Sequence, residues 1–149
     1  MRAGSKQAQE GMSLIEVLVA LLILTVGILG AAAVQLNALK YTDSSRMTSQ
    51  ASFIAYDMMD RIRANAAADY TITPPTSGNL SVARDQDLYD FSTNIVNFGG
   101  PTATGTISLN QRVYTITINW NDSRAANATG TTRSFVLTSR ATVDPVATP

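Results

Sequence analysis

The chain begins with one long helical pattern. From Val17 to Leu39 no side chain is charged, and this apolar stretch reaches the roughly 20 residues that a helix needs to cross a bilayer. No proline occurs before Pro74, so nothing in the sequence breaks the helix earlier. After the apolar stretch, apolar residues recur at three- and four-residue steps: Met47, Ala51, Ile54, Met58 and Ile62. We therefore expect one helix from about Met12 to about Ala66.

A loop and a second, shorter helix follow. The segment Asp69–Asn79 contains two prolines and a glycine, which predicts a loop with a short extended piece at Tyr70–Thr73. The segment Asp85–Asp87 offers N-cap residues for a helix with apolar positions at Leu88, Phe91, Ile95 and Phe98. Gly99-Gly100-Pro101 is expected to end that helix.

The remainder of the chain is typical of strands. Thr104–Leu109 is expected to form the first strand, and Arg112–Trp120 the second. Ser134–Val143 is expected to form the third, with Phe135, Leu137, Ala141 and Val143 on one face. In the second strand, one face carries Tyr114, Ile116, Ile118 and Trp120. These patterns predict an α+β fold in which the amphipathic half of the long helix covers an antiparallel sheet of three or four strands.

Composition removes several classes of function. The 149 residues contain no histidine and no cysteine, which removes the usual general base, thiol nucleophiles and nearly all structural zinc sites. Eleven basic residues balance eleven acidic ones, and the basic residues are scattered, so no electrostatic footprint for nucleic acid is present. We therefore expect no nucleic-acid partner.

The segment Gly11–Glu16, with the sequence GMSLIE, carries the sharpest motif. Glu16 is the only charged residue between Glu10 and Lys40, and a carboxylate at the edge of a membrane segment is costly unless it has a role. The preceding residues are polar and include Arg2 and Lys6, the charge bias that keeps an N-terminus in the cytoplasm. The soluble part is then expected across the membrane.

A short basic leader, GMSLIE and a long uncharged helix together resemble the type III signal of type IV pilins and pseudopilins. This resemblance implies that a prepilin peptidase cuts after Gly11 and methylates the new amino terminus of Met12. Phenylalanine is commoner than methionine at that position in the family. The resemblance also implies that Glu16, the fifth residue of the mature chain, docks the subunit during assembly.

Physical chemistry supports the docking role of Glu16 independently. Each cleaved chain creates a cation at its amino terminus, and pairing of Glu16 with the Met12 amine of a neighbour would satisfy both charges. Because that contact is heterologous, it produces a helical fibre instead of a closed ring. The plainer alternative is a carboxylate in the first turn of a helix, where the helix dipole favours it.

The longer segment from Gly11 to Lys40, with the extension through DMMDRIRAN, is similar to the V-type minor pilins (PilV, the type IV pilus modification family). Major pilins usually have a proline in the membrane helix and a disulfide near the C-terminus. This chain has Ala33 at the corresponding helix position and contains no cysteine. The resemblance implies a leader at residues 1–11 and a membrane or filament-core half-helix at 12–39. An amphipathic half-helix at 40–66 and a globular periplasmic part at 67–149 complete a pilin-like fold.

This resemblance implies a minor pilin that takes part in type IV pilus assembly, in a priming or tip complex. It also implies a structural subunit that is not an enzyme and needs no cofactor. Its expected partners are the prepilin peptidase and methyltransferase, other minor pilins, the major pilin and a tip adhesin. Its expected place is the inner membrane and then the pilus at the cell surface. Two alternatives stay open: a minor pseudopilin of type II secretion, and an adhesin on a plain single-pass anchor.

Two further groups of residues have candidate chemistry. Asp85, Asp87 and Asp90 offer three oxygen donors that suggest calcium, although they lack the spacing of an EF-hand and equally explain a helix N-terminus. Trp120 and Tyr114 share one strand face, which suggests either a sugar platform or, as we favour, a packed core. We therefore predict no metal site.

Overall fold

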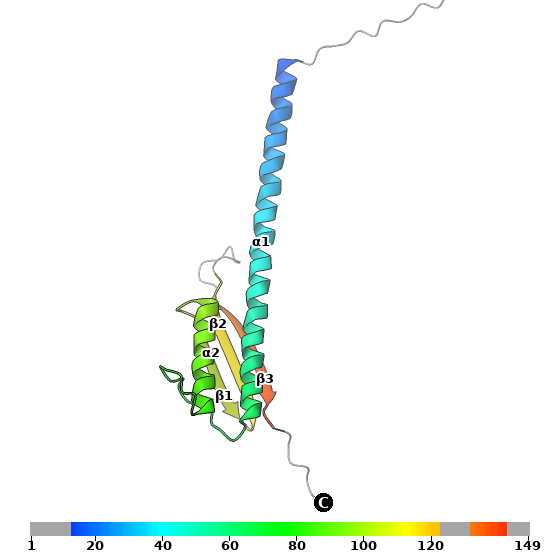
Figure 1. The fold of residues 1–149 in the computed structure, drawn as a ribbon. Helices are drawn as coiled ribbons and strands as arrows, with labels where there is room; N and C mark the ends of the chain where they lie inside the picture. Colours follow the sequence, from blue (N-terminus) through cyan, green and yellow to red (C-terminus); the bar gives the residue numbers. More distant parts are fainter. Residues whose placement is uncertain (1–12, 123–131, 143–149) are drawn as a thin grey trace, which may run out of the picture. The chain divides into compact units, whose positions relative to one another are not determined.

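The structure is a computed structural model that describes residues 13–122 and 132–142. In these ranges it forms five elements: α1 (Leu14–Ala64), α2 (Ala83–Gly99), β1 (Thr104–Asn110), β2 (Val113–Asn121) and β3 (Thr132–Arg140) (Figure 1). The chain divides into two compact units, one ending at Leu39 and the other beginning at Lys40, and α1 contributes to both. The predicted α+β arrangement, with a long N-terminal helix and a small antiparallel sheet, is confirmed.

The sheet is a meander of three antiparallel strands in the order β1-β2-β3. In β2 the burial alternates strictly, as expected for a strand with one covered face. The buried side chains are the predicted ones: Tyr114, Ile116, Ile118 and Trp120. Trp120 and Tyr114 are therefore core residues, and the sugar-platform alternative is wrong.

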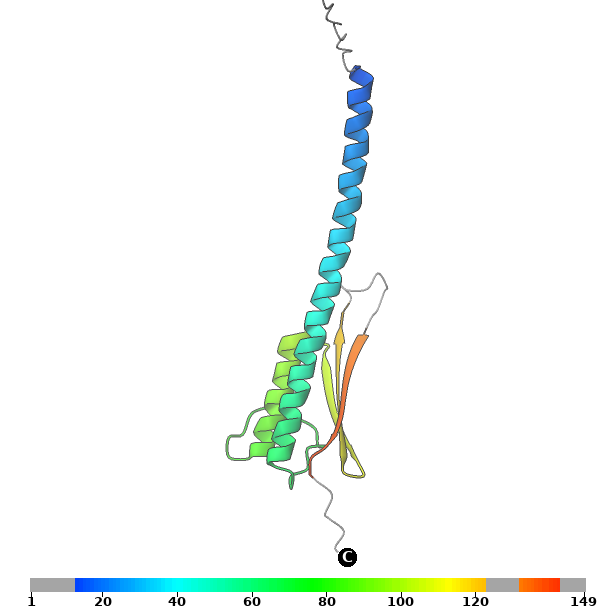
Figure 2. The same cartoon turned by 90° about the vertical axis from the view of Figure 1, so that its right-hand side faces the viewer.

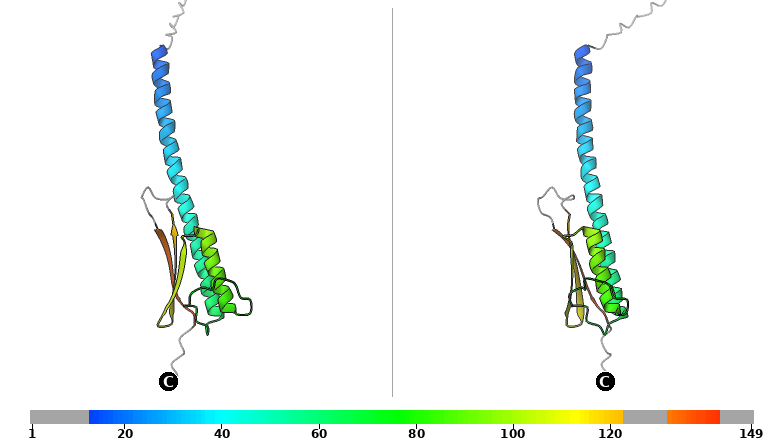
Figure 3. Two further views of the ribbon diagram at one scale, coloured as in Figure 1. Left: turned by 90° about the vertical axis from the view of Figure 1, so that its left-hand side faces the viewer. Right: turned by 60° about the vertical axis from the view of Figure 1, so that its left-hand side comes forward.

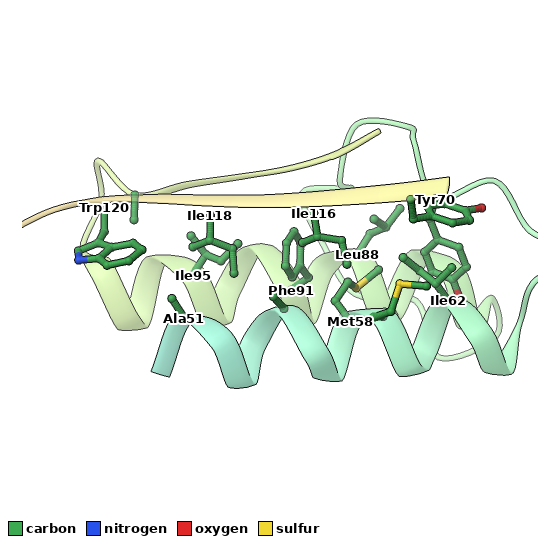
Figure 4. Packing of buried hydrophobic residues seen from close by; sticks show 14 residues of the cluster. Ala51, Met58, Ile62, Tyr70, Leu88, Phe91, Ile95, Ile116, Ile118 and Trp120 are labelled. Carbon is green, nitrogen blue, oxygen red and sulfur yellow. The ribbon is translucent and has the colours of Figure 1, made fainter. Parts of the chain in front are cut away.

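The C-terminal part of α1 and the whole of α2 lie on the same face of the sheet (Figures 2 and 3). The predicted apolar stripe of α1 supplies Ala51, Met58 and Ile62 to the core, and Ala55 and Met59 widen it beyond the prediction. Leu88, Phe91 and Ile95 come from α2, as the sequence predicted. Figure 4 shows Ile116, Ile118 and Trp120 projecting from the strand toward both helices. This three-element core holds the second unit together.

Helix α2 begins earlier than its sequence indicates. Its N-cap is Val82, which makes no side-chain capping bond, and Asp85 lies within the first turn. The prediction that Asp85–Asp87 caps this helix is therefore wrong, because the chain already enters helical geometry at Ala83. At the other end, Gly100 has φ 82° and its N–H donates to a carbonyl of the last turn, so the predicted stop is confirmed.

The strand boundaries also differ from the predicted ones. Gln111 and Arg112, with φ of 47° and 66°, form the two-residue turn between β1 and β2. This conformation suits a hairpin turn, so Arg112 lies outside the strand that it was expected to begin. β3 ends at Arg140 because Arg140 pairs with Val113, where β2 begins. The predicted end of that strand, Val143, lies outside the described residues, and Tyr70–Thr73 forms no strand.

A buried carboxylate ties the end of the sheet to α1. Asp122 directly follows β2 and is 2% exposed. It accepts a hydrogen bond of 2.6 Å from the Ser44 hydroxyl, and Arg133 Nε lies 3.9 Å away. These contacts offset the cost of removing the charge from water.

Arg61 connects α1 to α2 through ion pairs. Its Nε lies 2.9 Å from Asp57 on the same helix, and its Nη1 lies 2.9 Å from Asp87 and 3.1 Å from Asp90 on α2. Burial opposes the charged guanidinium, but these carboxylates outweigh it and raise the pKa of Arg61. A further ion pair within α1 joins Arg63 Nη1 to Asp60 at 2.9 Å.

Replacing Arg61 with methionine is expected to lower the free energy of unfolding by about 1–3 kcal/mol, because it leaves two aspartates of α2 beside each other without their cation. Arg63→Met is the matched control, since Arg63 is more exposed, and its loss is expected to be under about 1 kcal/mol. Urea titration of the detergent-solubilised chain, followed by the fluorescence of its single tryptophan, measures both. Equal losses would contradict the bridging role of Arg61.

Tyr70 is fully buried and extends the same network. Its hydroxyl donates to Asp87 at 2.8 Å and accepts from Asn65 at 3.3 Å. Burial and the bond to Asp87 raise the pKa of Tyr70 to about 12. The network thus joins the end of α1, the following loop and α2.

The raised pKa predicts a loss of stability in alkali. The phenol must stay neutral in the folded chain, so its contribution is present below pH 10 and is lost as pH rises from 10 to 12. The full loss is roughly 3 kcal/mol for a shift of about two units. Urea titrations at several pH values should show this slope, and Tyr70→Phe should remove most of it. The control Tyr56→Phe, at an exposed position, should leave the slope unchanged.

Candidate functional site: the start of the long helix

Ser13 fixes the point at which α1 begins. Its hydroxyl accepts a hydrogen bond of 3.3 Å from the Glu16 N–H, and its carbonyl accepts from the N–H groups of Glu16 and Val17. Ser13 is therefore the N-cap of the helix. This role of Ser13 was not predicted, although the spacing Ser13-x-x-Glu16 is that of a capping box.

Glu16 lies in the first turn of α1 and is exposed. In the part of the chain that the structure describes, its carboxylate forms no ion pair and does not close the capping box by a bond to the Ser13 N–H. The helix dipole favours a negative charge at this end, as the plainer alternative requires. The carboxylate nevertheless keeps its acceptor oxygens available to a group from outside the chain. The docking role of Glu16 stays a prediction.

The apolar part of α1 is not covered by any other part of the chain that the structure describes. Its most apolar 18-residue window has a mean hydropathy of 2.8, and none of that window is buried. Among the described residues, α1 is the one helix that is long and apolar enough to cross a membrane. Large apolar side chains such as Leu14, Ile15 and Leu29 are about 70–80% exposed. Such a surface is stable only in lipid or against other apolar helices.

Small and polar residues shape the middle of this surface. The Thr25 hydroxyl donates to the Leu22 carbonyl at 2.8 Å, so it presents no unpaired donor to lipid. A Cβ atom added at Gly27 or Gly30 would meet no atom within 4 Å. These positions therefore leave room for another helix to approach closely.

The predicted cleavage and methylation site falls on Gly11 and Met12, which lie outside the described residues. What the structure describes is the segment immediately after it. Ser13 and the first turn of α1 place Glu16 one turn into the helix from that site. Cleavage after Gly11 and methylation of Met12 remain predictions from the sequence.

The second candidate site, at the three aspartates of α2, has a structural role. Asp87 and Asp90 bind Arg61, and Asp85 binds Arg84 at 2.8 Å. Within residues 13–122 and 132–142, no group of three acidic side chains is arranged to hold a metal ion. The calcium alternative is therefore not supported, because the carboxylates are already used by arginines. The partner Arg61 was not predicted, since it lies 26 residues before Asp87.

Comparison with known protein families gives one match. Residues 6–32 match the prokaryotic N-terminal methylation motif, a range that includes Gly11, Met12 and Glu16. The match supports a type IV pilin-like protein. The motif implies processing by a prepilin peptidase and assembly with other pilins or pseudopilins, and with the apolar helix it is consistent with anchoring in the inner membrane. Neither the curated proteins nor the solved structures gave a match to this chain.

Proposed function

We propose that this pilin-like chain is a minor pilin of a type IV pilus, acting in the complex that primes assembly and sits at the tip. The observation that carries the proposal is the methylation motif over residues 6–32, joined to a helix whose apolar half is left uncovered by the described residues. The chain then acts as a structural subunit and not as an enzyme. The resemblance to V-type minor pilins favours this subgroup.

The proposed mechanism follows from the charges near the start of α1. The leader stays in the cytoplasm while the soluble part reaches the periplasm. Cleavage after Gly11 frees the Met12 amine, which becomes methylated and remains a cation. Glu16, which has no ion-pair partner in the described chain, then pairs with the amine of a neighbouring subunit. Contacts of this head-to-tail kind extend into a helical filament as α1 leaves the lipid.

A minor pseudopilin of type II secretion is the second candidate, because pseudopilins share the same N-terminal motif and the same kind of fold. The two are separated by shearing filaments from the cell surface and probing the sheared fraction for the chain. A pilus subunit is expected in that fraction, and its deletion should reduce piliation. If the chain stays in the envelope and its deletion blocks protein secretion while pili remain, the minor-pilin proposal is overturned.

A membrane-anchored adhesin is the remaining alternative. It predicts that the leader stays attached, because a plain anchor needs no prepilin peptidase. It also predicts that substitution of Glu16 has no effect on where the chain is found. Both outcomes differ from those of an assembling subunit.

A further inference from the structure

The sheet has an unpaired edge at β1. β1 pairs with β2 on one side, and it is the outermost strand on the other. Among the described residues, no backbone hydrogen bond joins that outer side to another segment. A strand edge of this kind presents a row of N–H and C=O groups that another extended chain can pair with.

This edge lacks the usual protection against pairing. β1 has the sequence TGTISLN, which contains no charge and no proline over its seven residues. The opposite edge strand, β3, carries Arg133 and Arg140 near its two ends. Charged residues and prolines are the common devices that keep edge strands from joining other chains. The edge at β1 is thus the one that is open to a partner strand.

A cavity lies beside the same edge. It has a volume of about 230 Å³ and is lined by the segment Tyr70–Pro74, by Leu88 and Phe91 of α2, and by Gly105–Ile107 of β1. No charged side chain lines it, and Leu88 and Phe91 belong to the apolar core. The cavity therefore offers an uncharged and partly apolar recess next to unpaired backbone groups.

Packing holds β1 in place at this point. A Cβ atom added at Gly105 would collide with the side chains of Ile95 and Phe91 on α2. The strand thus lies directly against the helix, and a larger residue at Gly105 would force these side chains to move. An edge that is held this firmly is preorganised, which reduces the entropy lost when a partner binds.

We propose that the free edge of β1 accepts an extended, uncharged segment of a neighbouring subunit as a fourth strand. Only an extended polypeptide supplies donors and acceptors at the spacing of a strand edge, and the uncharged lining favours an uncharged segment. One of its apolar side chains would enter the cavity beside Leu88 and Phe91. The identity of the partner as a filament subunit rests on the proposed function.

Single-cysteine variants of the full chain test this proposal, because the natural chain has no cysteine. Thr106→Cys places a thiol on the exposed face of β1, and Thr138→Cys on the same face of β3 is the matched control. In native membranes the introduced cysteine is labelled with a maleimide that carries a short photoreactive diazirine. Light then crosslinks the label to its neighbours, and the crosslinked peptides are sequenced. With Thr106→Cys we expect a crosslink to a partner segment that contains no charged residue and no proline.

Hydrogen exchange on the complex gives an independent reading of the backbone. Exchange of the β1 amides is expected to slow by at least about tenfold relative to the isolated subunit, while the β3 amides change little. Three results would overturn the proposal: equal adducts from both variants, adducts only with a second copy of this chain, or no slowing in β1. The N-terminus is sequenced in the same sample, so that an unprocessed leader reports failure of the proposed function separately from failure of strand addition.

Discussion

Replacing Glu16 with alanine is expected to leave the chain cleaved and membrane-bound but to lower its incorporation into filaments by about tenfold or more. Glu16 has no ion-pair partner among the described residues, so its loss removes no contact within the chain. In an assembled filament it would leave the amine of a neighbour unpaired in apolar surroundings. Breaking one side of a buried ion pair costs about 3–5 kcal/mol, and ~1.4 kcal/mol already corresponds to a factor of ten.

The matched control is Glu10→Ala, which changes a nearby carboxylate that the proposed cleavage removes. Both variants are quantified by immunoblot in the membrane and sheared-filament fractions, with the N-terminus checked by mass spectrometry. Glu10→Ala is expected to reach filaments as the natural chain does. Normal incorporation of the Glu16→Ala variant would remove the docking role and favour the plainer role in the helix dipole.

Replacing Ile116 with alanine is expected to destabilise the second unit by about 2–5 kcal/mol. Ile116 is fully buried at the middle of β2, opposite Ile107 and Leu137 of the flanking strands. Its loss removes apolar contacts and leaves a cavity that the surrounding core fills only in part. The free energy of unfolding of a small domain is about 5–15 kcal/mol in total, so this substitution removes a large share of its stability.

Thr117→Ala is the matched control, because Thr117 is the next residue of the same strand and faces away from the helices. Its effect is expected to stay below about 1 kcal/mol. Urea titration of both full-length variants in detergent measures the difference, and Trp120, which is 2% exposed, reports unfolding through its fluorescence. If the two variants lose equal stability, β2 does not form the centre of the core.

The sequence predicted most of the fold because its two strongest signals are periodic. An uncharged run followed by a three- and four-residue repeat, without proline, specifies α1 to within a few residues. Strict alternation in β2 identifies both the strand and its buried face. The ends of the strands were predicted less accurately, because they depend on the register of pairing. β3 ends at Arg140, which pairs with Val113, the first residue of β2.

The site was predicted less completely. The motif at Gly11–Glu16 could be identified from the sequence because all its parts are adjacent in the chain. The family match covers the same residues. Ser13 was missed although its capping spacing was visible in the sequence. The contacts of Arg61 with Asp87 and Asp90 join residues 26 and 29 positions apart, and only the packing of α2 against α1 brings these residues together.

The measurement that tests the central claim most directly is mass spectrometry of the N-terminus of the chain, purified from membranes of cells with an active prepilin peptidase. The proposed function predicts a chain that begins at Met12, carries a methyl group on its amine and lacks residues 1–11. A substitution of Gly11 should leave the leader attached and serves as the reference for the uncut mass. A natural chain that retains Met1 in these cells would contradict the proposal that it is a processed pilin-like subunit.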